Sequence, residues 1–348
     1  MEFLIDYGLF FAKSVTVLVV IALVLALIAS NKQKISGQNK GHIEVKNLNE
    51  TFADYTDAIK SVVLDEAQLK KEHKDKQKQE KQDRKAQKKS TEQVPERRKR
   101  VYVIDFDGDI KASANSSLRE EITAVLGLAE SQDEVVIKLE SGGGMVHSYG
   151  LAASQLTRIT EKSIPLTVCV DKVAASGGYM MACVADKIVA APFAILGSIG
   201  VVAQLPNFHR LLKKNDIDYE MYTAGEFKRT VTMFGENTEK GRTKFLEDLE
   251  KTHVLFKDYV QEHRSVVDVD KVATGEVWYG RRALDERLID ELKTSDGYLL
   301  DQAQKADIFR VEFTQKKSLP EKLGFAAEST LDRLLVRWLS RVQSKRWF

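Results

Sequence analysis

Short apolar runs alternate with amphipathic runs from residue 101 onward. Strands are predicted where β-branched and apolar residues cluster, and helices where apolar positions recur every three or four residues. The predicted strands cover 101–106, 134–139, 165–170, 187–191 and 219–222, and the predicted helices cover 117–131, 145–159, 176–185 and 238–263. This alternation indicates an α/β fold with parallel strands and covering helices.

A long apolar stretch near the N-terminus predicts a membrane anchor within residues 1–31. Residues 9–29 carry a single charge, Lys13. As a helix this stretch would be about 31 Å long, which matches the roughly 30 Å hydrocarbon core of a bilayer. A cleaved signal peptide is the alternative, but the run is long for one, and residues 27–30 lack a small-x-small cleavage pattern.

A second uncharged stretch covers residues 188–206. Pro192, Gly197 and Gly200 interrupt it, and it lies inside the alternating α/β pattern. We therefore interpret it as a buried strand followed by a turn, not as a second membrane span.

Charge is concentrated between the anchor and the first predicted strand. Residues 66–100 hold fourteen Lys and Arg against seven Asp and Glu, whereas the net charge of the whole chain is only +2. So polar a run cannot bury a face, and we assign residues 32–100 to a charged tether, partly helical or disordered. Attraction to anionic lipid headgroups is an alternative role; a nucleic-acid arm would need interleaved aromatic residues, so we expect no nucleic-acid partner.

The C-terminal residues 321–348 form a second region outside the α/β pattern. From residue 331 they combine Leu, Val and Trp with four arginines, as a basic amphipathic helix does. We favour a packing or oligomer helix over a helix that lies on a membrane surface. The α/β domain between the charged tether and this tail is accordingly expected to cover residues 101–320.

The two cysteines provide no metal site or disulfide framework. Cys169 and Cys183 lie in apolar strings, where a buried reduced thiol is the usual state. With 43% apolar residues, the chain has the composition of a globular protein large enough for an enzyme.

Two glycine-rich segments each supply one part of an acyl-transfer site. Residues 140–146 (ESGGGMV) form a turn between a predicted strand and a predicted helix, where backbone amides can approach a ligand oxygen. In residues 173–179 (VAASGGY), Ser176 has small neighbours that give a substrate carbonyl access, and the amide of Gly177 follows it. The alternative for Ser176 is a helix N-cap.

A third segment, residues 224–229 (AGEFKR), supplies a candidate base, Lys228. Burial beside Ser176 would favour the neutral amine, which can accept the serine proton. Lys172 and Lys187 compete for this role, although each borders a strand, where exposure at a turn is ordinary. Among the six histidines only His147 lies near a glycine motif, and we expect it to be structural because it falls within a predicted helix.

Four segments in this order resemble the motifs of the signal peptide peptidase A family. They are residues 174–179, 196–201, 226–228 and 280–290, within a resemblance that covers about 101–300. The anchor and charged tether that precede them look like those of the family's half-length members. The resemblance implies a ClpP/crotonase-type fold, no metal or organic cofactor, and rings in which serine and lysine meet across neighbouring subunits.

The resemblance also implies residue roles. Ser176 would be the nucleophile and Lys228 the general base, while Ser198 would position the lysine amine. The oxyanion hole would combine the Gly177 amide with the glycine turn at Gly143 or Gly144.

Two positions depart from the family pattern. Gly142 stands where the family usually has proline, which is expected to loosen the oxyanion turn. Arg287 stands where the family more often has glycine, which is expected to matter little to the chemistry.

The sequence thus predicts a serine endopeptidase anchored in a bacterial inner membrane. Its substrates would be signal-peptide remnants or unfolded and damaged proteins. The family's best-known catalytic domains face the periplasm, and we expect the same here, although the lysines after the anchor favour the cytoplasm. The alternatives are a crotonase-type acyl-CoA lyase or isomerase, which normally needs a carboxylate base, and a catalytically silent membrane scaffold.

Overall fold

The computed structural model describes residues 41–65 and 97–315, with scattered positions at 8–20 and 67–78. The expected anchor and most of the charged run lie largely outside these residues, and the expected tail lies entirely outside them. No helix formed by the described residues is both long and apolar enough to cross a bilayer.

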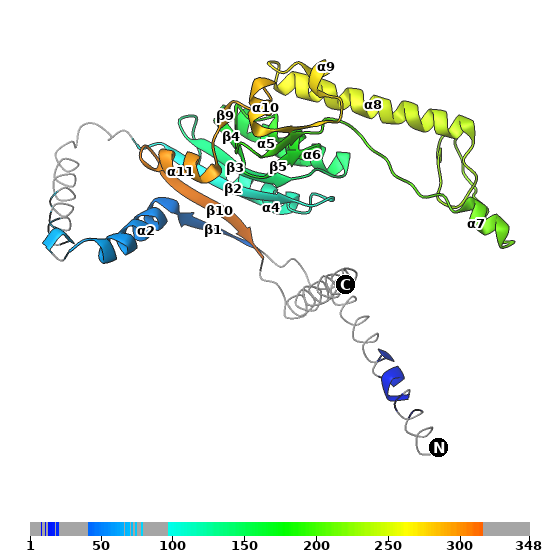
Figure 1. The fold of residues 1–348 in the computed structure, drawn as a ribbon, viewed down its shortest axis with the longest axis horizontal. Coiled ribbons are helices and arrows are strands. Elements are labelled where there is room, and N and C mark those ends of the chain that lie inside the picture. The colour runs from blue at the N-terminus through cyan, green and yellow to red at the C-terminus, as the bar shows by residue number, and fades with distance from the viewer. Residues whose placement is uncertain are drawn as a thin grey trace, which may run out of the picture. The chain divides into compact units, whose positions relative to one another are not determined.

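The described strands form one ten-stranded sheet (Figure 1). Its main path runs β1-β10-β2-β3-β4-β6-β9, and the shorter strands β5, β7 and β8 branch from β3. The strand bounds are β1 (His42–Asn47), β2 (Arg100–Gly108), β3 (Glu134–Ser141), β4 (Leu166–Val170), β5 (Val173–Ala175), β6 (Lys187–Ala190), β7 (Ile195–Gly197), β8 (Val277–Tyr279), β9 (Glu291–Leu292) and β10 (Asp307–Thr314). The ladders from β10 across β2, β3, β4 and β6 to β9 are parallel, which confirms the predicted α/β class.

Helices cover both faces of the sheet because apolar residues occupy both sides of the central strands. In β2, Val101 and Val103 join one buried cluster, while Tyr102, Ile104 and Phe106 join the other. The first cluster packs against α2 and α11, and the second packs against α4, α5 and α6. The helix bounds are α2 (Leu48–Val63), α4 (Asn115–Leu126), α5 (Val146–Thr160), α6 (Gly177–Ala182), α7 (His209–Lys214), α8 (Glu239–His263), α9 (Val269–Val272), α10 (Gly280–Asp285) and α11 (Ser295–Ala303).

Most predicted elements agree with this order, but one strand is wrong. The predicted strand at 219–222 is irregular chain between α7 and α8, and none of the described strands lies beside it to complete its hydrogen bonds. Two predicted helices are too long at their C-terminal ends, since α4 ends at Leu126 and α6 at Ala182. The uncharged stretch 188–206 contains β6 and β7 and no helix, as predicted.

An ordered strand and helix occur inside the range expected for the tether. The side chain of Asn47 caps α2, accepting a hydrogen bond from the Asn49 amide at 3.0 Å. The side-chain nitrogen of Asn49 donates to the carbonyls of Ala303 and Ala306, at 3.1 and 3.0 Å. Its side-chain oxygen accepts from the Ile308 N–H at 2.7 Å. Asn49 therefore fastens α2 to both α11 and β10.

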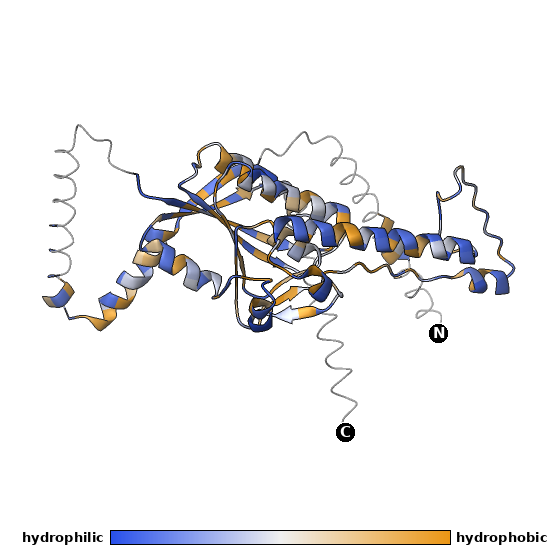
Figure 2. Cartoon of the chain, turned by 90° about the horizontal axis from the view of Figure 1, so that it is seen from above, coloured by the Kyte–Doolittle hydropathy of each residue, from blue (hydrophilic) through white to orange (hydrophobic). Residues whose placement is uncertain are grey.

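The sheet and its covering helices form what we call the body. Residues 201–238, which we call the arm, extend away from this body, and the chain then returns to it along α8. Figure 1 shows α7 near the end of α8 that lies away from α6. Figure 2 shows an apolar stretch that leads from the body to α7, and within it Val202 is 79% exposed. The arm has little regular structure and leaves many apolar side chains in solvent: Val202, Leu205, Phe208, Leu211, Ile217, Tyr219, Met221, Tyr222, Phe227, Met233 and Phe234.

Candidate active site

Ser176 lies at a sharp turn between β5 and α6. Its φ of +52° is in the left-handed region, which a residue with a side chain enters only at a cost of about 1 kcal/mol or more. The turn is held because the Ser176 N–H donates to the Gly197 carbonyl at 2.8 Å, next to the parallel pairing of β5 with β7. Ser176 is thus a strained residue fixed by the sheet.

The hydroxyl of Ser176 does not cap α6. Ser176 occupies the N-cap position, but its side chain makes no capping hydrogen bond. No other hydrogen bond to this hydroxyl occurs among the described residues, and the side chain is half-buried. The helix-cap alternative is therefore wrong, and the hydroxyl remains available for chemistry.

A small cavity opens beside this hydroxyl. Its volume is about 20 Å³, enough for about one water molecule. It is lined by Ser176 together with Gly144, Val146, Gly177, Met180, Gly200, Val201, Thr252 and Phe256. The glycine turn, the start of α6 and the body end of α8 thus meet at Ser176.

The glycine turn, residues 140–146, directly contacts the turn around Ser176, which we call the nucleophile loop. Gly143 has a φ of +88°, and a Cβ atom there would lie 2.7 Å from both the Ser176 Cβ and the Gly177 nitrogen. The Gly143 N–H donates to the Ser141 Oγ at 3.0 Å, so it is already used. The amides of Gly144 and Gly177 have no acceptor within the described part of the chain. Gly144, rather than Gly143, is the better placed partner of Gly177 as an oxyanion donor.

Ser198 lies close to Ser176 in the same chain. It directly follows Gly197, whose carbonyl holds the Ser176 amide, and its own φ is +49°. The Ser198 N–H donates to the Glu276 carbonyl at 2.7 Å, while its Oγ lies 3.5 Å from the Gly275 carbonyl oxygen, a long and weak contact. The Ser198 hydroxyl can therefore reorient toward an incoming group.

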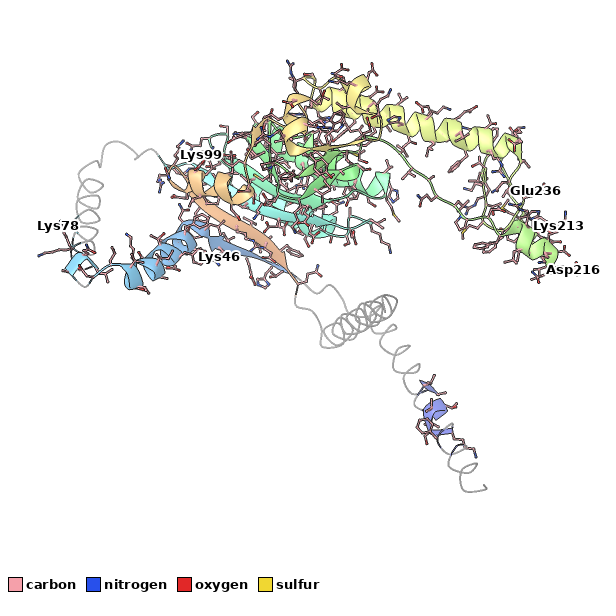
Figure 3. All side chains as sticks on the ribbon, in the orientation of Figure 1. Lys46, Lys78, Lys99, Lys213, Asp216 and Glu236 are labelled. Carbon is pink, nitrogen blue, oxygen red and sulfur yellow. The ribbon has the colours of Figure 1, made fainter. Side chains whose placement is uncertain are left out.

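Lys228 is not brought to Ser176 within one chain. It is exposed on the arm and lines a different cavity, of about 710 Å³, with arm residues such as Tyr219, Tyr222 and Phe234. Its Nζ makes no hydrogen bond or ion pair with any described residue. Figure 3 labels Lys213, Asp216 and Glu236 at the end of the arm near α7, away from the body.

The competing bases are occupied or misplaced. The Lys172 Nζ lies 2.9 and 3.0 Å from the two Glu140 carboxylate oxygens, and this hydrogen bonding raises the pKa of the Lys172 ammonium, which disfavours a basic role. The Lys187 Nζ is paired with Glu291 at 2.7 Å. His147 is exposed in the first turn of α5 and does not line the Ser176 cavity.

Two polar residues behind the glycine turn were not predicted as part of the site. The Ser141 Oγ lies 2.5 Å from the Tyr149 hydroxyl, and both side chains are buried. Ser141 belongs to the glycine-rich segment, and Tyr149 falls within the predicted helix 145–159. The only sequence signal was a tyrosine among the small apolar residues of a core-facing helix stripe, which by itself indicates packing.

A strained serine with a free hydroxyl, set beside unpaired amides at a helix start, defines the acyl-transfer site of a serine hydrolase. Residues 2–156 match Peptidase family S49 N-terminal, and residues 158–308 match Peptidase family S49. The chain is 50% identical over 344 residues to "Probable protease SohB" of Haemophilus influenzae, covering 98% of this chain and 97% of that protein. It is 40% identical to "Putative protease SohB" of Buchnera aphidicola subsp. Baizongia pistaciae, covering 98% and 99%.

The chain therefore belongs to peptidase family S49 and is a serine endopeptidase, as the four motifs indicated. This membership decides against the acyl-CoA enzyme and the silent scaffold. Among solved structures, a mutant of the 1510-N membrane-bound stomatin-specific protease in complex with a substrate peptide is similar, with 14% identity and a TM-score of 0.40 over 65% of this chain and 96% of that one.

Proposed function

We propose that the protein is a membrane-anchored serine endopeptidase in which Ser176 is the nucleophile and Lys228 of a neighbouring copy is the general base. The observation that carries this proposal is the Ser176 turn: a free hydroxyl at a φ of +52°, next to a cavity bordered by two unpaired amides. The same fold and site support a ClpP/crotonase-type arrangement, because the short strands β5 and β7 hold the nucleophile loop at the branch of a parallel sheet.

The proposed reaction follows from these positions. The neutral amine of Lys228 takes the proton from the Ser176 Oγ, which attacks the carbonyl carbon of the peptide. The amides of Gly177 and Gly144 hold the resulting oxyanion. When the C–N bond breaks, the Lys228 ammonium returns the proton to the leaving amine, and water then releases the acyl group by the same route.

Assembly is proposed because Ser176 and Lys228, the two members of the proposed dyad, do not meet within one chain. The arm carries Lys228 and a series of exposed apolar side chains, among them Tyr222 at 87% exposure. A large apolar surface on a soluble region usually marks a protein contact. Symmetric copies of one chain can repeat such a contact around a ring, which would place each arm beside the next copy's serine. Ser198 would then hold the arriving amine.

The division of the chain is proposed as a membrane anchor in residues 1–31, a charged segment, a peptidase body and a basic tail in residues 321–348. The contacts of Asn49 support adding β1 and α2 to the body. The narrow cavity at Ser176 supports an extended, unfolded substrate such as a signal-peptide remnant or a damaged protein. We propose the periplasmic side of the inner membrane, which a compartment-specific reporter fused at residue 41 tests; cytoplasmic reporter activity would overturn it.

Mixed assemblies test the proposed dyad. Ser176→Ala and Lys228→Ala should each lower peptide cleavage by about a thousandfold or more, because either change removes the activated nucleophile. Equal mixing of the two inactive variants within one oligomer should restore about a quarter of the normal activity, since one site in four would pair an intact serine with a neighbour's intact lysine.

The matched control is Lys213→Ala, which removes another exposed lysine from the arm and should leave activity unchanged. Differently tagged copies establish that the oligomers are mixed. Full activity of Lys228→Ala would exclude this lysine as the base. Mixed oligomers without any recovery would exclude a dyad shared between copies.

A further inference from the structure

Tyr149 lies directly behind the glycine turn, in α5. It is fully buried, and its hydroxyl donates to the Asp109 carbonyl at 2.7 Å. Burial also raises the pKa of the Tyr149 phenol, so it keeps its proton and remains a donor at neutral and moderately alkaline pH. The same hydroxyl lies 2.5 Å from the Ser141 Oγ.

The direction of this hydrogen-bond chain is fixed by its two ends. The Asp109 carbonyl can only accept, so the proton of Tyr149 points to it. The Ser141 Oγ also lies 3.3 Å from the Gly108 carbonyl, but its proton is needed in the much shorter contact with the Tyr149 oxygen, where Ser141 is therefore the donor. The Ser141 Oγ in turn accepts from the Gly143 N–H at 3.0 Å. A single line of donors therefore runs from Gly143 through Ser141 and Tyr149 to the backbone at Asp109, and each bond polarises the next.

The ring of Tyr149 supports the other side of the site. A Cβ atom on Gly177 would overlap the Tyr149 ring, so the ring and the Gly177 backbone are in close contact. The Gly178 backbone likewise packs on the Ser141 carbonyl, where a Cβ atom would lie 2.5 Å away. One side chain thus touches the Gly177 segment with its ring and holds the Gly143–Gly144 turn through its hydroxyl.

We propose that Tyr149, acting through Ser141, is a positioning residue that sets the spacing of the two oxyanion donors, Gly144 and Gly177. This inference rests on the proposed role of Ser176. Fixing Gly143 turns its N–H away from the site and leaves the Gly144 amide to face the substrate oxygen. Because the oxyanion develops in the transition state and the tetrahedral intermediate but is absent from the bound substrate, a misplaced donor lowers kcat and leaves KM almost unchanged.

The experiment uses the full-length protein and a short fluorogenic peptide that the unmodified protein cleaves. Tyr149→Phe keeps the ring and removes the hydroxyl, and it should lower kcat by about 10- to 100-fold with KM changed less than about twofold. Ser141→Ala, which leaves the Gly143 N–H without its acceptor, should lower kcat at least as much. A peptide aldehyde, whose adduct carries the oxyanion, should lose affinity in proportion to kcat/KM, whereas a cleaved product peptide should bind normally.

Tyr298→Phe is the matched control. Its hydroxyl is also buried and lies 2.5 Å from a carboxylate oxygen of Glu134, but it belongs to the cluster on the opposite face of the sheet. This variant should keep its kcat even where its melting temperature falls as much as that of Tyr149→Phe. Normal kcat in Tyr149→Phe, or equal losses of aldehyde and product affinity, would overturn the proposal. Activity retained by Ser176→Ala would instead remove the nucleophile assignment on which it rests.

Discussion

The nucleophile loop and the arm are built in opposite ways. Around Ser176 the chain is tightly packed, because a Cβ atom on Gly143, Gly144, Gly177 or Gly178 would lie 2.1 to 2.7 Å from neighbouring atoms. The arm has few buried side chains, and its Tyr222 is 87% exposed. The proposed oxyanion donors are thus packed into the core, whereas the proposed base, Lys228, lies on an exposed arm and makes no contact with Ser176 in a single chain.

This difference suggests a division of labour. Preorganised amides are effective because they need not reorient during the reaction, which requires a rigid setting. A lysine base needs a dry environment to remain neutral, and an exposed arm acquires one only when another surface covers it. The site would therefore be silent in a lone chain and complete after assembly.

Among the changes that test this difference, the largest effect should come from adding one methyl group beside Ser176. Gly143→Ala forces a side chain into a φ of +88° and against the Ser176 Cβ and the Gly177 nitrogen, so activity should fall at least about a hundredfold. Gly142→Ala is the matched control, because a Cβ atom there meets nothing within 4 Å and no positive φ is required. Steady-state cleavage of a peptide measures both, and similar activities would show that the turn is not the rigid element described here.

An intermediate effect is expected from the arm. Tyr222→Asp places a charge where the proposed contact would be apolar, so the oligomer should dissociate at least tenfold more readily and activity should fall with it. The thermal stability of the isolated chain should hardly change, because Tyr222 has little to lose on exposure. Analytical ultracentrifugation measures the assembly.

The control for this change is Val62→Asp, which alters a residue of α2 that is 85% exposed. It should leave the oligomer intact. If Tyr222→Asp unfolds the chain, or if both variants dissociate equally, the arm is not the special contact surface.

The smallest effect is expected at Arg287, a residue with a strained backbone and no proposed role in catalysis. Arg287 has a φ of +59° at the position where the resemblance indicates glycine. Its N–H donates to the Leu284 carbonyl at 3.0 Å and its carbonyl accepts from the Arg264 Nε at 2.9 Å, whereas its exposed side chain makes no hydrogen bond or ion pair with any described residue. Arg287→Gly should raise the free energy of unfolding by about 1 kcal/mol without changing kcat. Denaturant unfolding measures it. A loss of stability would mean that the Arg287 side chain has a role that its exposed position does not indicate.

The central strands and α8 could be predicted because burial imposes a readable pattern on them. Strand 134–141 has consecutive apolar residues at 135–137 and is buried at six of its eight positions, as a sheet covered on both faces requires. Residues 219–222 include two tyrosines, which also favour strands, but no strand formed by the described residues lies beside them. Composition alone cannot supply a hydrogen-bonding partner.

Some parts of the candidate site could be predicted from the order of residues along the chain, and other parts could not. Ser176 and its glycines lie next to one another at the ends of β3 and β5, where parallel strands bring distant residues together. Tyr149 was missed because its role depends on the direction of one hydroxyl inside the core. Ser176 and Lys228 could be paired only through the family resemblance, and because the described chain does not bring them together, their meeting across subunits stays a prediction.

The hydrogen bonds of Asn49 with α11 and β10 would also limit how far an anchored form of the enzyme can move from the membrane. The body begins at β1, so a span that ends at Ala29 would be followed by only twelve intervening residues, 30–41, with a fully extended reach of about 40 Å. Because both α2 and β2 belong to the body, the residues that connect them add nothing to this reach. The active site of such a peptidase would stay within a thin layer of solution at the membrane surface, and it would cleave only substrates that enter that layer.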